Sequence, residues 1–155
     1  MRHTLATLAV IVGIATQGPS TLHAKDSTPH DTTLVGSWFV TVTPTVMPAF
    51  VGLTTIGADG SVIETNALTL ASSLESPGHG RWVRITAHRY ALTFVNLEVN
   101  PDGSYAGTGK VHATVILTSS GQLTGTFEVA LLDPNGVLLF SDSGTVSGKR
   151  IEVEP

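Results

Sequence analysis

The chain has 155 residues, no cysteine and a formal net charge of −4 at pH 7. The lack of cysteine excludes disulfides, thiolate nucleophiles and cysteine-ligated metal sites. The mild acidic excess argues against nucleic acid or an anionic membrane surface as a partner. Charged residues make up only 13% of the chain, which is about half the usual share, so we expect a surface rich in Thr and Ser or covered by another subunit.

The N-terminus has the features of a secretory signal peptide. Arg2 gives a basic start, residues 5–15 are apolar, Pro19 breaks any helix, and Ala24 offers a small residue at the cleavage point. The apolar run is shorter than the roughly 20 residues that span a bilayer, so we expect no membrane insertion. We predict a signal peptide at 1–24, a flexible leader at 25–33 and one domain at 34–155, located in the periplasm or secreted.

Four dipeptides divide the remaining chain into short segments. Asp59-Gly60, Asp102-Gly103, Ser120-Gly121 and Asn135-Gly136 are pairs that favour tight turns, because glycine and its Asp or Asn neighbour tolerate positive φ. The segments between them are rich in Val, Thr, Ile and Phe and alternate with a period of two. This pattern predicts a meander of antiparallel strands.

Eight strands are predicted, at residues 34–43, 50–56, 62–67, 81–87, 90–99, 105–118, 123–132 and 137–153. Eight strands suffice to close a barrel that holds side chains or one small ligand. Residues 68–79 lack the alternation, so we expect a loop or one helical turn that covers one mouth. The predicted fold class is all-β, an eight-stranded antiparallel up-and-down barrel.

The predicted strand at 90–99 is apolar on both faces. Tyr90, Leu92 and Phe94 share one face with Asn96 and Glu98, and the other face carries Ala91, Val95, Leu97 and Val99. Only one face can enter the lumen, so the other would leave an apolar stripe on the surface. We therefore expect a homodimer or trimer through the outer face of strands four to six.

The first and last predicted strands together carry a motif. Gly36-Ser37-Trp38 opens the first strand and Arg150 lies near the end of the last. A guanidinium over an indole gains cation–π attraction, and its donors can satisfy backbone carbonyls where the chain enters. These positions resemble the calycin and lipocalin pattern, which implies a calycin-like barrel with a ligand-binding lumen. The sequence lacks the lipocalin cysteines and a Thr-Asp-Tyr-like segment, so it is similar to a bare calycin-like barrel.

A second resemblance is to small allene-oxide-cyclase-like and dirigent-like barrels, which guide cyclisations without cofactors. The shared features are size, secretion and strand number, without a specific motif. This resemblance implies an isomerase, cyclase or lyase that uses the lumen and needs no cofactor.

The first functional hypothesis is a binding module for a small hydrophobic molecule. Its predicted lumen walls are Trp38, Phe50, Trp82, Phe94, Asn96 and Phe127. The second hypothesis is the cofactor-free enzyme, with His79, Tyr90, Arg84 and Glu64 as the candidates for proton transfer. The third is a structural envelope protein with a filled barrel. A wholly apolar cavity would favour carriage, whereas converging titratable groups would favour catalysis.

The individual candidates leave alternatives open. His79 lies between two glycines, so it is either an acid or base at the barrel mouth or an exposed histidine in a glycine-rich turn. Arg84 and Glu64 either pair inside the barrel or face solvent near strand ends. We expect no metal site, since His30, His79, His88 and His112 lack a paired ligand spacing.

Overall fold

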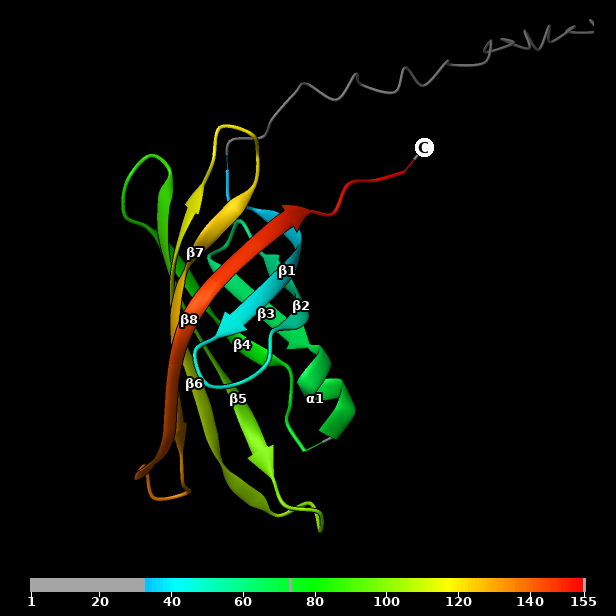
Figure 1. Cartoon of the computed structure of the whole chain (residues 1–155), viewed down its shortest axis with the longest axis vertical. Helices are drawn as coiled ribbons and strands as arrows, with labels where there is room; N and C mark the ends of the chain where they lie inside the picture. Colours follow the sequence, from blue (N-terminus) through cyan, green and yellow to red (C-terminus); the bar gives the residue numbers. More distant parts are fainter. Residues whose placement is uncertain (1–32, 73, 155) are drawn as a thin grey trace, which may run out of the picture.

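The alternating segments pair in chain order until the last strand closes on the first, which forms a closed barrel (Figure 1). All neighbouring strands are antiparallel, so the predicted up-and-down barrel is confirmed. The computed structural model describes residues 33–72 and 74–154. The predicted signal peptide at 1–24 and residues 25–32 of the predicted leader lie outside the described residues.

The strands are β1 (Gly36–Pro44), β2 (Phe50–Ile56), β3 (Ser61–Asn66), β4 (Gly78–Arg84), β5 (Arg89–Val99), β6 (Tyr105–Leu117), β7 (Leu123–Leu132) and β8 (Leu138–Arg150), with one helix, α1 (Ala67–Ser72), after β3. The expected glycine-rich turn before residue 81 is wrong. Gly78 and Gly80 pair with Glu64 and Val62 of β3, so β4 begins three residues earlier. Strand β8 ends at Arg150 rather than at residue 153.

Two of the predicted tight turns, at Asp59-Gly60 and Asp102-Gly103, share the same pattern of side-chain hydrogen bonds. Gly60 and Gly103 have φ of +88° and +82°, a region that favours glycine. The preceding aspartate accepts hydrogen bonds from the following serine, at 2.9 Å from the Ser61 amide and 2.6 Å from its hydroxyl after Asp59. Asp102 binds Ser104 with the same two distances. These local bonds fix the register of the two hairpins.

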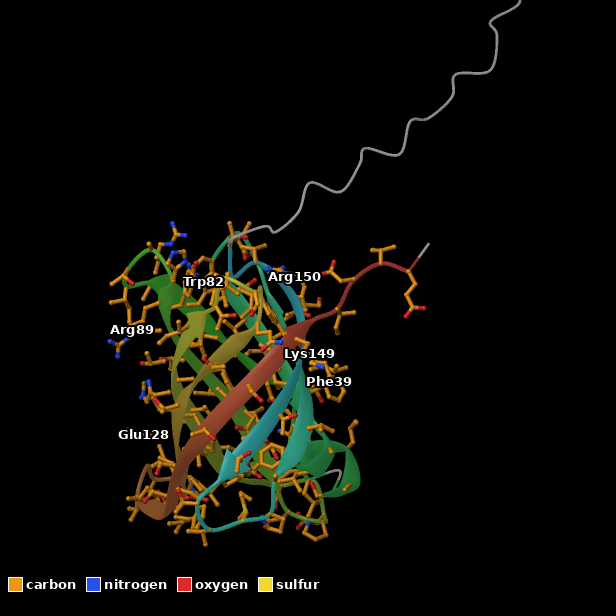
Figure 2. The ribbon with its side chains drawn as sticks, turned by 45° about the horizontal axis from the view of Figure 1, so that its top comes forward. Phe39, Trp82, Arg89, Glu128, Lys149 and Arg150 are labelled. Atoms are coloured by element: carbon orange, nitrogen blue, oxygen red, sulfur yellow. The ribbon has the colours of Figure 1, made fainter. Side chains whose placement is uncertain are left out.

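The two ends of the barrel differ. At one end β1 enters and β8 leaves, and Trp82 and Arg150 both lie there (Figure 2). Most of the fully buried side chains also lie toward this end: Leu34, Trp38, Ile56, Val62 and Tyr90. Helix α1, the β1–β2 loop and the β7–β8 hairpin lie at the other end (Figure 1). One end is therefore a packed core, and the other surrounds a cavity.

The outer surface carries both charged and apolar side chains. Phe39, Arg89, Glu128 and Lys149 point outward (Figure 2). On β5 the predicted outer stripe does face outward, since Val95 and Leu97 are 40% and 53% exposed. Assembly through this stripe stays a prediction. Within the described residues, no helix has the length and apolarity needed to cross a membrane.

Candidate functional site

The closed end is built around Trp38. Its indole nitrogen donates to the Leu34 carbonyl at 3.0 Å, and the guanidinium carbon of Arg150 lies 4.5 Å from the centre of the Trp38 ring system. Arg150 also donates to the carbonyls of Val35 at 2.5 Å and Thr33 at 2.7 Å. The predicted Trp38–Arg150 contact is confirmed, and it joins the entry of the chain to its last strand.

Gly36 allows this contact in two ways. Its φ is +135°, which L side chains rarely adopt. A Cβ at this position would also collide with the Arg150 guanidinium. The Gly-x-Trp spacing and the distant arginine are therefore one structural unit.

Three further predicted site residues gather at the same end. Trp82 donates to the Gly57 carbonyl at 2.8 Å and contacts Tyr90 edge-on, with ring centroids 5.7 Å apart. Arg84 donates to the Tyr90 hydroxyl at 3.2 Å. Arg84 and Tyr90 thus pair with each other, and neither lines the cavity. Trp38 and Trp82 also lie outside its lining, so these four side chains serve barrel closure.

The other end holds a cavity of about 350 Å³, a volume at the low end of the roughly 300–1,000 Å³ usual for ligand sites. Ile56, Val115 and Leu123 belong both to its lining and to the buried core, and they form its floor. Met47 and Phe140 line it and are partly exposed, so it reaches the surface. Four predicted lumen residues lie in its walls: Phe50, Phe94, Asn96 and Phe127.

One side of the cavity is polar. Glu64 and Asn66 come from β3, Asn96 and Glu98 from β5, and Glu75 from the segment between α1 and β4. The Asn96 amide donates to Glu98 at 2.7 Å. Asn66 accepts from the Leu68 and Thr69 amides at 2.9 and 3.0 Å, which caps α1, and it also hydrogen-bonds Glu64. The helix and the carboxylate are thus held by one amide.

Main-chain pairing brings Glu75 to the cavity. Residues Glu75 and Glu98 form an isolated antiparallel bridge. The Ser76 amide donates to the Leu97 carbonyl at 2.9 Å, and the Val99 amide donates to the Leu74 carbonyl at 2.8 Å. Two carboxylates on directly opposed residues repel each other. The main-chain bridge therefore keeps these two carboxylates close together despite their mutual repulsion.

Glycines make room for the polar groups. A Cβ on Gly52 would lie 3.3 Å from one carboxylate oxygen of Glu64, and a Cβ on Gly78 would lie 3.3 Å from the other. A Cβ on Gly109 would collide with the Asn96 amide group. At these positions the glycines let side chains lie flat against a neighbouring backbone.

Burial changes the proton affinity of this cluster. Desolvation raises the pKa of Glu64 to about 7, against the opposing hydrogen bond from Asn66. Burial and the nearby charge of Glu98 raise the pKa of Glu75. None of the described residues that line the cavity is Lys, Arg or His. The polar side is therefore rich in acceptors, and burial brings the pKa of Glu64 close to neutral pH.

The histidines do not join this cluster. His79 is exposed on the outer face of β4, paired with Ile63 and Val95 on either side. His112 is exposed on β6 and bonds the Thr93 hydroxyl at 2.8 Å. Over residues 33–72 and 74–154, no three His, Asp or Glu side chains are grouped as metal ligands.

Sequence reasoning did not select Asn66 or Glu75 as site residues, and it left Glu98 open between the lumen and solvent. Asn66 carries a usable signal, because Asn before a short helix is a common N-cap. Glu98 shares the face of Asn96 by simple alternation. Glu75 carries no such signal, since its position depends on a non-local bridge.

In comparisons with known proteins, no family model matches the sequence and no curated protein matches it.

Proposed function

We propose that the protein binds a small, mainly apolar molecule in the lumen of the barrel. The main support for this proposal is the preformed cavity of about 350 Å³ with aliphatic and aromatic walls. Transfer of apolar surface out of water contributes about 25 cal/mol per Å², and a preformed site loses little of this to reorganisation. Side chains leave this part of the lumen open, which favours a binding protein over a structural protein whose barrel is filled.

Two further expectations belong to this proposal. The sequence of residues 1–24 supports export, so binding would take place in the periplasm or outside the cell. The exposed apolar positions of β5 support a homo-oligomer, in which each barrel keeps its own lumen. The cavity is bounded by one chain, so binding does not require the second copy.

Ligand retention tests the proposal. Native mass spectrometry of the protein purified from its own host should show an adduct that organic solvent removes. Ala113 lines the cavity, so Ala113→Phe should fill it and abolish the adduct. Ala91 lies on the other face of the neighbouring strand β5, and Ala91→Phe is the matched control.

A neutral fluorescent probe, N-phenyl-1-naphthylamine, extends the test to protein stripped of any ligand. The native chain should enhance its emission, and the Ala113→Phe variant should not. Thermal melting shows whether each variant is folded. A native protein that carries no adduct and does not bind the probe contradicts the proposal.

A second candidate is a cofactor-free isomerase, cyclase or lyase in the same lumen. The observation that favours it is Glu64, a buried carboxyl with a pKa raised to about 7 inside the cavity. Such a group can donate and accept a proton at neutral pH. The test is Glu64→Gln, which would retain the adduct but stop its conversion to an isomeric or cleaved product, as followed by chromatography.

A further inference from the structure

The cavity is electrostatically one-sided. Glu64, Glu75 and Glu98 lie along β3, β5 and the segment before β4, whereas the facing walls from β6 to β8 are mainly apolar. No basic side chain of the described residues lines the cavity. A buried carboxylate is normally compensated by a cation or several hydrogen bonds. The charge on this side has no such cation among the described residues.

Two deeply buried side chains have unused acceptor capacity toward the cavity. Asn96 is 5% exposed; its amide nitrogen donates to Glu98, and its side-chain carbonyl oxygen accepts no hydrogen bond from the described residues. Glu64 is 8% exposed, and Asn66 is the one side chain of the described residues that hydrogen-bonds it. Each carboxylate can accept several hydrogen bonds. The polar side therefore presents more acceptors than donors.

An ammonium group has the complementary chemistry. It carries three donors and no acceptor, and hydrogen bonds between charged partners are shorter and stronger than neutral ones. The apolar walls require the rest of the ligand to be hydrophobic. A metal ion would satisfy the charge but not the walls, and the described residues include no grouped set of metal-ligating side chains.

We propose that the ligand is a small primary amine with an apolar body, whose ammonium group binds between Glu64, Glu98 and the side-chain carbonyl of Asn96. The glycines at 52, 78 and 109 keep these acceptors against the wall, so the lumen stays free for the apolar part. The inference rests on the proposed binding function and deepens it. It specifies the chemical class of the ligand.

In this arrangement the affinity for an amine should depend on pH. The side chains that act on Glu64 are Asn66 from β3 and Glu75 from the segment before β4, and the Asn96–Glu98 pair of β5 lines the same cavity. Burial raises the Glu64 pKa to about 7, and an ammonium ion binds the ionised form. Affinity therefore rises as pH rises through 7. It falls again only when the amine itself loses its proton, at about pH 10.

Calorimetric titration with three ten-carbon probes tests the proposal on the full chain. Decylamine, decanol and decanoate share a tail and differ in the head group. At about pH 8.5 decylamine should bind about tenfold more tightly than decanol, since charge-assisted hydrogen bonds exceed neutral ones by roughly that factor. Decanoate should bind most weakly. Decylamine affinity should fall severalfold at about pH 6, and decanol affinity should not change.

Two variants locate the effect. Glu64→Gln keeps the shape of the side chain and should reduce the preference for decylamine over decanol to within about threefold. Its dependence on pH should be weaker than in the native protein, with Glu75 as the remaining lining carboxyl whose pKa is raised. Glu128→Gln, on the outer face of β7 (Figure 2), is the matched control and should behave as the native protein. Thermal melting confirms that both variants fold.

The outcomes separate the two proposals. Equal binding of decylamine and decanol by the native protein overturns the amine proposal and leaves apolar binding intact. A decylamine preference that survives Glu64→Gln also overturns it. Failure of all three probes to bind contradicts the underlying binding function as well.

Discussion

The two ends of this barrel treat buried polar groups in opposite ways. At the closed end the Trp38 indole donates to a backbone carbonyl, and Arg150 donates to two more while covering the ring. At the open end Glu64 and Asn96 are also buried, yet their side chains line a cavity. The same alternating strands thus produce a satisfied core at one end and an acceptor-rich lumen at the other.

The difference shows where stability and binding reside. A packed end with its donors matched to carbonyls stabilises the fold and offers nothing to a ligand. An end with unmatched acceptors is destabilised until a donor arrives. Substitutions at the closed end should therefore lower stability, whereas neutralising the open end should raise it.

The largest expected effect is at Trp38. Trp38→Ala should lower the free energy of unfolding by about 3–5 kcal/mol, because it removes a fully buried indole and leaves a void under Arg150. Phe50→Ala removes an aromatic ring that is half-buried and already lines a cavity, so it should lower this free energy by only about 1 kcal/mol. Urea denaturation monitored by circular dichroism measures both. Equal losses would contradict the division into two ends.

A substitution at Glu64 should change the free energy of unfolding in the opposite direction. The carboxyl ionises near 4.5 in the unfolded chain and at about 7 in the barrel, so between these values the folded state binds more protons. The free energy of unfolding therefore falls as pH rises across this window, by up to about 3 kcal/mol. Glu64→Gln should remove this loss, so that the variant is more stable than the native protein above pH 7 and similar to it near pH 4.5.

Urea denaturation at several pH values tests this prediction. The pKa of Glu75 is also raised, so its ionisation destabilises in the same direction. The difference between native and variant, rather than the native slope alone, isolates Glu64. Glu128→Gln on the outer surface is the control and should show no gain. A Glu64→Gln variant that is less stable at every pH contradicts the unmatched-acceptor interpretation.

Most of the fold follows from local sequence signals, but the site follows only in part. Period-two alternation predicted which residues face inward, so Phe50, Phe94, Asn96 and Phe127 were placed in the lumen where the cavity is found. Alternation carries no information on depth along the barrel axis. For this reason Trp38 and Trp82 were predicted as lumen walls although they lie at the closed end.

The acidic side of the cavity was harder to predict. Glu75 reaches it through a bridge to Glu98, 23 residues along the chain, and a non-local bridge leaves no periodic trace near residue 75. The glycine-rich start of β4 was read as a turn, which hid the alternation that places His79 outside. Gly78 and Gly80 continue the strand because β3 pairs with them, and pairing across strands overrides local propensity.

Arg150 offers a finer test of the closed end. Arg150→Gln should lower the free energy of unfolding by about 1–3 kcal/mol, since it removes charge-assisted bonds to two carbonyls and the cation over Trp38. Arg150→Lys keeps the charge but cannot donate to both carbonyls with a planar fork, so its loss should be intermediate. Neither variant should change binding of a lumen probe. Weaker probe binding in both would mean that the two ends are coupled.

The smallest effect on stability is expected on the outer face, which belongs to neither end. Val95 and Leu97 are exposed on β5, and Val95 pairs with His79 and Lys110 on either side. Val95→Lys combined with Leu97→Lys should therefore leave the fold and lumen binding intact, with a change in unfolding free energy below about 1 kcal/mol. Sedimentation should show the native protein as an oligomer and this variant as a monomer, because two lysines on the stripe prevent a second copy from burying it.

Lysines at Thr124 and Thr126, two exposed positions on β7, form the matched control and should preserve the oligomer. A native protein that sediments as a monomer at micromolar concentration would rule out assembly through β5, and an unfolded Val95, Leu97 variant would contradict the outward placement of these two residues.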